Sequence, residues 1–172
     1  NWKKGLDRLI PALALVKQTH LVIAGNDEEN YTRVVYDLAK KHGVRDRISV
    51  VGYVTGHDKT ALLTHATMLV LPSYSENFGN VVLEAMAAGC PVAVSPAVGL
   101  AAIVREKEAG IVVDGDPSSL GASLSQVIRD QDKLNEMGKN GQAVARERID
   151  CQRIAAEMTL VYENILTKRY TH

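Results

Sequence analysis

Five short apolar segments alternate with longer amphipathic segments along most of this chain. The apolar segments are Leu21–Ala24, Ile48–Val51, Met68–Leu71, Pro91–Ser95 and Ile111–Val113. Such alternation is typical of repeated strand–helix units that build a parallel sheet. Their nearly uniform apolar character indicates strands covered by helices on both faces. The sequence therefore predicts an α/β fold, a Rossmann-like doubly wound parallel sheet.

Helical periodicity fills the intervals between the predicted strands. Apolar positions recur at three- and four-residue steps over Leu6–Lys17, Glu28–Lys41, Asp58–His65 and Val81–Ala88. Asp58 and Asn80 are predicted N-caps, and Gly43 and Gly89 are predicted C-terminal stops. After Asp116 the pattern is helical only, and we expect this tail to pack over the sheet. Its predicted helices are Ser118–Arg129, Gln131–Arg146 and Cys151–Leu166.

Length and composition narrow the functional classes. With 172 residues, the chain has the size of one domain, 1–172. Its 20 basic and 20 acidic residues give a formal net charge of +0, which argues against a nucleic-acid partner. No apolar run has the roughly 20 residues of a transmembrane segment. The two cysteines, Cys90 and Cys151, lie far apart, which favours a cytoplasmic protein.

The chain opens with a predicted helix at Leu6, whereas a doubly wound sheet normally begins with a strand near its centre. We therefore expect the first strand of the sheet to lie upstream of Asn1.

The segment Pro72–Asn80 joins a predicted strand to a predicted helix. In open α/β sheets, ligands bind at this edge. Gly79 precedes the helix, whose first amides can donate hydrogen bonds to a phosphate. An ordinary connecting loop is the alternative interpretation.

Glu84 is the one charged residue between Phe78 and Val104, so its carboxylate needs a partner. A diol such as a ribose would provide it. The alternatives are a glutamate that points between core and solvent, or one paired with an arginine from the helical tail. Glu76 lies in the preceding loop and would approach the same ligand from another direction. Paired carboxylates also occur in glycoside hydrolases, but those enzymes need no phosphate-binding helix terminus.

Lys3 and Lys4 precede Gly5 and a predicted helix, where positive charge opposes the helix dipole. A bound anion would explain these cations, and two solvated lysines are the alternative. The sequence contains no GxGxxG motif after Gly25 and no Walker loop. Its five histidines show no metal-ligand spacing with cysteines or carboxylates. We therefore expect neither a cofactor nor a metal.

The segment Ser73–Val92 resembles the E-x7-E segment of retaining, nucleotide-sugar-dependent glycosyltransferases with the GT-B fold, family four, also called glycosyl transferases group 1. Lys4–Asp7 resembles the lysine turn of that family, and Val51–Val54 resembles its base-pocket turn. Leu69–Ser73 and Val161–Tyr162 also resemble the corresponding segments of that family. The resemblance covers almost the whole chain and implies the C-terminal, donor-binding half of such an enzyme.

The resemblance also implies roles for individual residues. Glu84 would hold the ribose hydroxyls, Glu76 would lie against the donor sugar, and Lys4 would neutralise the leaving diphosphate in place of a metal. Lys4 and Glu76 are thus the expected catalytic residues. The other expected substrate-binding residues are Tyr53 and Val54 for the base, and Asn77, Phe78, Gly79, Asn80 and Val81 for the diphosphate and sugar.

Transfer with retention in this family is thought to pass through an oxocarbenium-like state on one face, which requires no covalent nucleophile. The expected donor is a UDP-sugar or GDP-sugar, used in polysaccharide biosynthesis. The acceptor, a sugar or a lipid-linked glycan, would bind an N-terminal domain that this chain lacks, and the isolated domain would be inactive. That missing domain would also place the protein at the periphery of the inner membrane.

Two departures from the family pattern concern the donor site. Members usually have an arginine shortly before the lysine, and they tend to have a second glycine where Leu100 follows Gly99 here. A nucleotide-sugar epimerase or a phosphorylase with the same half-fold is one alternative function. A non-catalytic nucleotide-sugar-binding domain is another.

Overall fold

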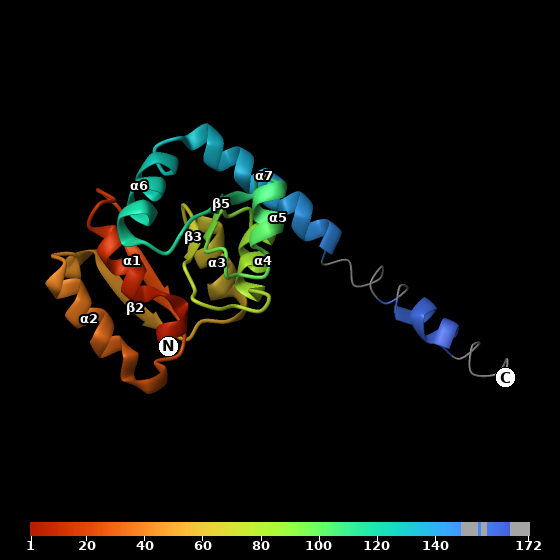
Figure 1. The fold of residues 1–172 in the computed structure, drawn as a ribbon, viewed down its shortest axis with the longest axis horizontal. Coiled ribbons are helices and arrows are strands. Elements are labelled where there is room, and N and C mark those ends of the chain that lie inside the picture. Colours follow the sequence, from red (N-terminus) through yellow and green to blue (C-terminus); the bar gives the residue numbers. More distant parts are fainter. Residues whose placement is uncertain (149–154, 156–157, 166–172) are drawn as a thin grey trace.

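The computed structural model describes residues 1–148, 155 and 158–165 (Figure 1). Its strands are β1 (Leu21–Ala24), β2 (Ile48–Gly52), β3 (Leu69–Leu71), β4 (Val92–Val94) and β5 (Gly110–Val112). Its α-helices are α1 (Leu6–Leu13), α2 (Tyr31–Lys41), α3 (Gly56–His65), α4 (Asn80–Ala87), α5 (Ala101–Glu106), α6 (Pro117–Val127) and α7 (Gln131–Arg148). Short 3-10 turns are η1 (Trp2–Lys4), η2 (Glu28–Asn30) and η3 (Arg45–Arg47).

The strands form two parallel sheets. β1 pairs with β2, with Leu21 opposite Ile48. β4 lies between β3 and β5, with Val92 opposite both Leu69 and Gly110. The α/β fold and its parallel strands are therefore confirmed. Among the described residues, no strand pairs with the second edge of β1 or of β3.

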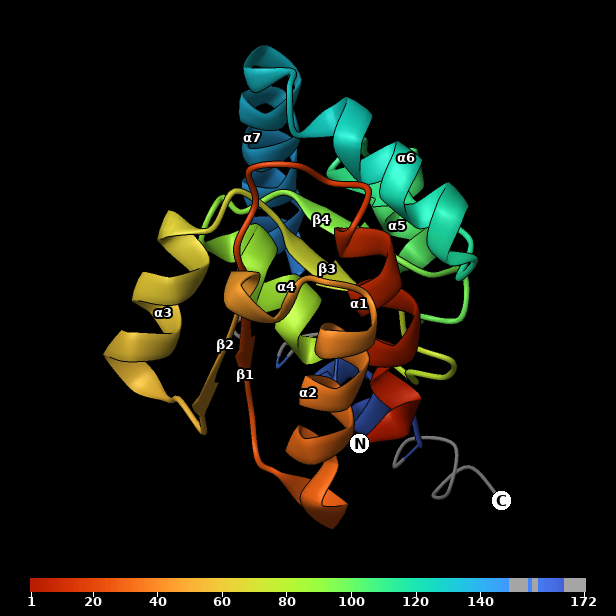
Figure 2. The same ribbon diagram turned by 90° about the vertical axis from the view of Figure 1, so that its left-hand side faces the viewer.

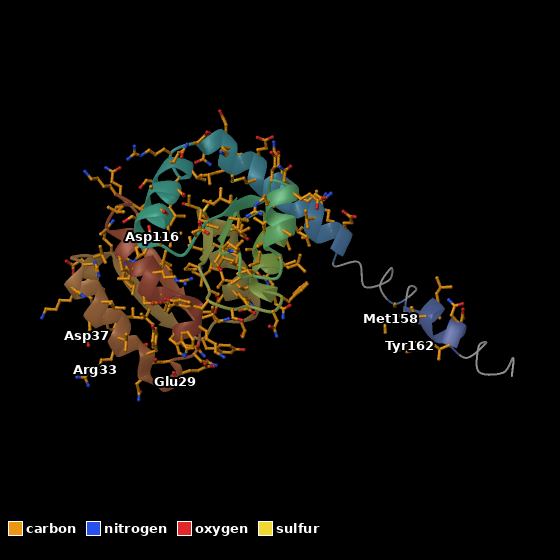
Figure 3. The ribbon with its side chains drawn as sticks, viewed as in Figure 1. Glu29, Arg33, Asp37, Asp116, Met158 and Tyr162 are labelled. Carbon is orange, nitrogen blue, oxygen red and sulfur yellow. The ribbon has the colours of Figure 1, made fainter. Side chains whose placement is uncertain are left out.

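The sheet of β1 and β2 packs on α1 and α2. The apolar cluster between them includes Ile10, Leu13, Val35, Ala39 and Ile48. Figure 2 shows α3 on the other side of these strands from α1 and α2. Glu29, Arg33 and Asp37 lie along the outer side of η2 and α2, exposed and directed away from the molecule (Figure 3).

Burial along β1 alternates, which corrects the expectation of strands buried on both faces. Leu21 and Ile23 are partly buried, whereas Val22 is 45% exposed and Ala24 is exposed. The reason is that α1 and α2 pack closely on one face of this two-stranded sheet. On the other face the described residues, α3 included, leave Val22 and Ala24 exposed. β4 behaves as expected, since Val92, Ala93 and Val94 are fully buried.

The second core surrounds β4 and contains side chains from α4, α5 and α7. It includes Met86, Val94, Val104 and Val144. Leu120 and Leu124 of α6 pack with Leu9 and Ala12 of α1. Asp116 stands at the start of α6 (Figure 3), where its side chain accepts a hydrogen bond from the Ser119 amide. These two tail helices therefore pack over the sheets as predicted.

The predicted helix Cys151–Leu166 lies partly outside the described residues. Residues 158–165 are helical and exposed, and Met158 and Tyr162 stand away from the rest of the molecule (Figure 3). This segment therefore does not pack over the sheets, contrary to expectation. Its apolar side chains recur at three- and four-residue steps, but no other described segment covers them. No helix in the described ranges is long and apolar enough to cross a membrane.

The structure adds one short helix, moves two predicted N-caps and confirms two predicted helix stops. The structure adds α5, a six-residue helix between β4 and β5 that was not predicted because it spans less than two turns. The N-caps are Thr55 and Gly79, each ahead of the predicted Asp58 and Asn80. Gly43 and Gly89 follow α2 and α4 with positive φ, so the predicted helix stops are confirmed.

Candidate functional site

The loop between β3 and α4 is held in place by the loop that follows β4. The Glu76 amide donates to the carbonyl of Ala97 at 3.1 Å, and the Gly99 amide donates to the carbonyl of Glu76 at 2.9 Å. A Cβ on Gly99 would lie 2.0 Å from the Asn77 carbonyl oxygen. The absence of a side chain at Gly99 therefore allows the two loops to meet.

Gly79 turns the chain from this loop into α4. Its φ of 86° lies in the left-handed region, which glycine adopts without steric cost. The Val82 amide donates to the Gly79 carbonyl at 2.8 Å, and α4 begins at Asn80. The N-terminal amides of α4 thus lie at the carboxyl end of β3, where the sequence predicted a phosphate site. Phe78, Asn80 and Val81 are exposed or partly buried here.

The turn η1 docks on the same loop from the other end of the chain. The Tyr74 amide donates to the carbonyl of Lys3 at 2.8 Å. Gly5, with φ of 71°, ends the turn, and a Cβ there would lie 2.1 Å from the Pro72 carbonyl oxygen. This contact requires glycine at position 5, both for its conformation and for its lack of a side chain.

Docking of η1 brings together the two predicted catalytic residues. Lys4 Nζ lies 2.5 Å from Glu76 Oε2, with the Lys4 side chain 50% exposed and that of Glu76 22% exposed. A cavity of about 280 Å³ opens beside this pair, and Asn77 is one of its lining residues. Its other lining residues are Asn1, Lys3 and Ser75.

Tyr74 connects this loop to α1. Its hydroxyl donates to Asp7 Oδ2 at 2.6 Å, and the Arg8 guanidinium carbon lies 3.4 Å from its ring centroid. The ring of Trp2 packs against it with centroids 5.6 Å apart. Burial, and then the negative charge of Asp7, raise the pKa of the nearby Tyr31. Trp2, Tyr74 and Arg8 thus fix η1 and the loop relative to each other.

Glu84 lies in α4 beyond its first turn and faces α3. Its Oε2 is 2.5 Å from Lys59 Nζ, and the two side chains are 44% and 36% exposed. Of the alternatives considered from the sequence, pairing with an arginine of the tail is therefore wrong, because the cation beside this carboxylate is Lys59 of α3. In the described structure the carboxylate is paired and partly solvated, which removes the cost of leaving it alone in an apolar sequence.

Tyr53 and Val54 follow β2, at the carboxyl end of the other sheet. Tyr53 is 71% exposed, and Val54 is partly buried. Neither side chain makes a hydrogen bond to another described residue. The ion pair between Lys59 and Glu84 links the helix that follows this turn to α4.

A larger cavity, of about 540 Å³, lies at the opposite ends of β3 and β4. It is bounded by Thr67 and Pro91, which precede the strands, and by Asn135 and Lys139 of α7. None of the predicted site residues lines it. Because ligands of open α/β sheets bind at the carboxyl ends of strands, the smaller cavity is the better candidate.

Sequence reasoning left four residues of this region without a role. They are Asp7, Arg8, Lys59 and Tyr74. Tyr74 stands inside the segment that carries the family resemblance, which was an available signal. The contacts of Arg8 and Lys59 join parts of the chain that lie far apart in sequence, and no local pattern indicates such pairs.

Among the described residues, no three His, Cys, Asp or Glu side chains are grouped as metal ligands would be.

Comparisons with known proteins identify the family of this chain. Residues 1–144 match the family described as glycosyl transferases group 1. The uncharacterized glycosyltransferase MJ1607 of Methanocaldococcus jannaschii is 35% identical over 168 residues, which are 95% of this chain and 42% of that protein. The chain thus spans less than half the length of this relative.

Several solved structures share the fold. Sucrose-phosphate synthase from Thermosynechococcus elongatus has a TM-score of 0.86 at 28% identity, over 98% of this chain and 44% of that one. Anabaena Alr3699/HepE, in complex with UDP and glucose, has a TM-score of 0.86 at 25% identity, over 95% and 46% of the two chains. The predicted GT-B half-fold is therefore confirmed, and the chain belongs to the glycosyl transferases group 1 family.

Proposed function

We propose that this chain binds a nucleoside-diphosphate sugar and supplies the donor half of a retaining glycosyltransferase. The observation that carries the proposal is the approach of Lys4 to Glu76, 2.5 Å apart, beside a cavity at the carboxyl end of β3. The similar fold of HepE, in complex with UDP and glucose, supports a nucleotide and a sugar as the ligands.

The diphosphate would occupy the space between Lys4 and the start of α4. The ammonium group of Lys4 and the N-terminal amides of Asn80 and Val81 supply positive potential there. In the structure Glu76 balances the charge of Lys4. Because this pair is partly exposed, little free energy opposes the transfer of the ammonium group to a phosphate oxygen.

The sugar would lie against Glu76, Asn77 and Phe78, and the ribose against Glu84. Tyr53 and Val54 would border the base. As the bond between the anomeric carbon and the phosphate oxygen breaks, negative charge grows on the diphosphate, where Lys4 stabilises it. Stabilisation of charge that develops in the transition state is usually the largest catalytic contribution of a site. No nucleophilic side chain is required for this step.

The acceptor would bind a second, N-terminal domain, so we expect the 172-residue chain alone to bind donor without transferring its sugar. A sugar or a lipid-linked glycan is the proposed acceptor, reached from the cytoplasmic side of a membrane. A transfer assay with and without the second domain tests this, because transfer by the 172 residues alone would contradict it.

A strand that fills the space between β1 and β3 is part of the same proposal. The second edges of both strands lack partners among the described residues, and Val22 of β1 is 45% exposed. Unpaired strand edges leave backbone groups without hydrogen bonds, at about 1 to 3 kcal/mol for each buried group. Extending the chain upstream by about ten residues, a typical strand with its turn, should raise the melting temperature. Equal melting temperatures of the two proteins would contradict this part.

Calorimetry tests the binding function directly. The protein is titrated with UDP, GDP and ADP, and then with sugar derivatives of the nucleotide that binds. Saturable binding of one nucleotide, weakened in Lys4→Met but not in the exposed Lys17→Met, is the expected result. If none of the three nucleotides binds to the folded protein, the proposed function is wrong.

A further inference from the structure

The ion pair between Lys59 and Glu84 joins two helices that the proposed donor site uses for different purposes. α3 follows the turn of Tyr53 and Val54, which would border the base, and α4 carries Glu84, which would hold the ribose. Lys59 Nζ lies 2.5 Å from Glu84 Oε2. The side chain of Lys59 therefore reaches the carboxylate that would hold the ribose.

The position of Lys59 in its own helix is electrostatically unfavourable. It is the fourth residue of α3, close to the positive end of the helix dipole. The neighbouring Asp58 is in the first turn, where a negative charge is favoured, and is exposed. The favourable electrostatic contact of the Lys59 ammonium group is thus with its partner on α4 and not with its own helix.

The ion pair leaves Glu84 able to bind a diol. Its contact engages Oε2, and an ionised carboxylate offers about four acceptor positions on its two oxygens. A single cation on one oxygen restricts rotation of the carboxylate while acceptor positions remain for two hydroxyl groups. A restricted acceptor loses less conformational entropy when a ligand binds.

We propose that Lys59 is a positioning residue, which orients the Glu84 carboxylate toward the two ribose hydroxyls of the donor nucleotide. The inference rests on the proposed function, since it needs a nucleotide in the site. Lys59 acts through Glu84 and makes no contact with the ribose. It therefore determines how strongly the site distinguishes a ribonucleotide from one that lacks the 2′ and 3′ hydroxyls.

The alternative is that the pair only fastens α3 to α4. A partly exposed ion pair contributes little to stability, so removing Lys59 should leave the melting temperature nearly unchanged. A purely structural role would also affect every nucleotide equally. The dependence on the ribose hydroxyls is what separates the two explanations.

The experiment measures binding of two ligands by calorimetry: whichever of UDP, GDP and ADP binds to the wild type, and its 2′,3′-dideoxy analogue. The variants are Lys59→Met, Lys59→Arg, Glu84→Gln and the double variant Lys59→Met/Glu84→Gln. Lys40→Met is the matched control, because Lys40 is an exposed helical lysine on α2. Thermal melting of every variant verifies that it is folded.

We expect Lys59→Met to weaken ribonucleotide binding by about three- to tenfold, the size of a modest side-chain coupling. Binding of the dideoxy analogue should not change, and Lys59→Arg should retain most of the affinity. In the Glu84→Gln background, Lys59→Met should have no further effect. Lys40→Met should match the wild type with both ligands.

Three results would overturn the inference. Equal losses for the ribonucleotide and the dideoxy analogue would show that Lys59 acts on the phosphates or on the fold. A loss that persists in the Glu84→Gln background would show that it acts independently of Glu84. Wild-type affinities in Lys59→Met would assign it no role, while the proposed function would stand. Absence of nucleotide binding by the folded wild type would instead reject the proposed function, and this inference with it.

Discussion

The hydroxyl of Tyr74 donates a hydrogen bond to Asp7 Oδ2 at 2.6 Å, across 67 positions of sequence. The second oxygen of Asp7, Oδ1, is buried and has no hydrogen-bond partner among the described residues. The carboxylate of Asp7 therefore depends on Tyr74 for a strong hydrogen bond, and this bond ties α1 to the loop that precedes α4.

Tyr74→Phe should consequently destabilise the protein by about 1 to 2 kcal/mol, because a charge-assisted hydrogen bond is lost while the ring and its contact with Arg8 remain. Urea unfolding measures the change. Tyr36→Phe is the control, since Arg45 stacks on the Tyr36 ring in the same way. The Tyr36 hydroxyl makes no hydrogen bond to another described residue. Equal effects of the two substitutions would show that the bond to Asp7 contributes nothing.

Gly5→Ala should destabilise the protein by more than its conformation alone explains. Gly5 and Gly43 have similar φ, 71° and 68°, so alanine at either position carries a cost of about 1 kcal/mol. At Gly43 nothing lies within 4 Å of a new Cβ, whereas at Gly5 the Pro72 carbonyl oxygen is 2.1 Å away. We expect Gly5→Ala to cost about 2 to 4 kcal/mol, as overpacking does elsewhere. A cost equal to that of Gly43→Ala, by urea unfolding, would contradict the close contact.

Glu84→Gln should weaken nucleoside-diphosphate binding by about tenfold or more, because an amide replaces one acceptor oxygen with a donor. The variant also breaks the ion pair with Lys59, whose contribution to stability is small. Calorimetry therefore should show reduced affinity in a protein that melts close to the wild type. Unchanged affinity would remove Glu84 from the site.

Nucleotide binding should not require a divalent metal, because Lys4 and the α4 amides would supply the positive charge. Titration in EDTA and in magnesium or manganese should give the same affinity. Loss of binding in EDTA that either metal restores would show that a metal contributes charge at the diphosphate.

The Cys90 thiol should resist alkylation in the folded protein. Burial raises its pKa from 9.0 to about 11, and the sulfur lies near the carbonyl oxygens of Ala66 and Pro91. The folded protein holds the Cys90 proton more tightly than the unfolded chain does. The contribution of this thiol to the free energy of unfolding is therefore complete below pH 9 and decreases as the pH rises toward 11. Mass spectrometry of the Cys90 peptide after iodoacetamide treatment at pH 8 should show little label without urea and full label with it. Rapid labelling without urea would contradict the burial.

Much of the fold could be predicted because its signals are local. The strand Leu21–Ala24 has the predicted bounds, and the other four strands lie within two residues of theirs. Apolar runs and three- to four-residue periodicity depend on neighbouring positions in the chain. The helix stops at Gly43 and Gly89 were predictable for the same reason, since a glycine with positive φ ends a helix by its own conformation.

The features that were missed depend on which segments meet in three dimensions. The alternating burial of β1 follows from the cover on one face of its sheet, which the sequence of β1 does not specify. Lys59 pairs with Glu84 because α3 lies beside α4, and their separation of 25 positions carries no periodic signal. The N-cap at Gly79 was misplaced by one residue because Asn80, a common capping residue, follows it directly.

The contact of Lys3 with Tyr74 also determines when the proposed anion site forms. Lys4 and Glu76 are separated by 72 positions, so the site does not exist until the chain has closed a loop of that length. A ligand that contacts both Lys4 and Glu76 binds only those molecules in which this loop is closed. Its binding free energy therefore stabilises the closed loop against opening. Hydrogen exchange of the Tyr74 amide, which donates to Lys3, would report this closure at a single bond, and it should slow as ligand occupancy rises.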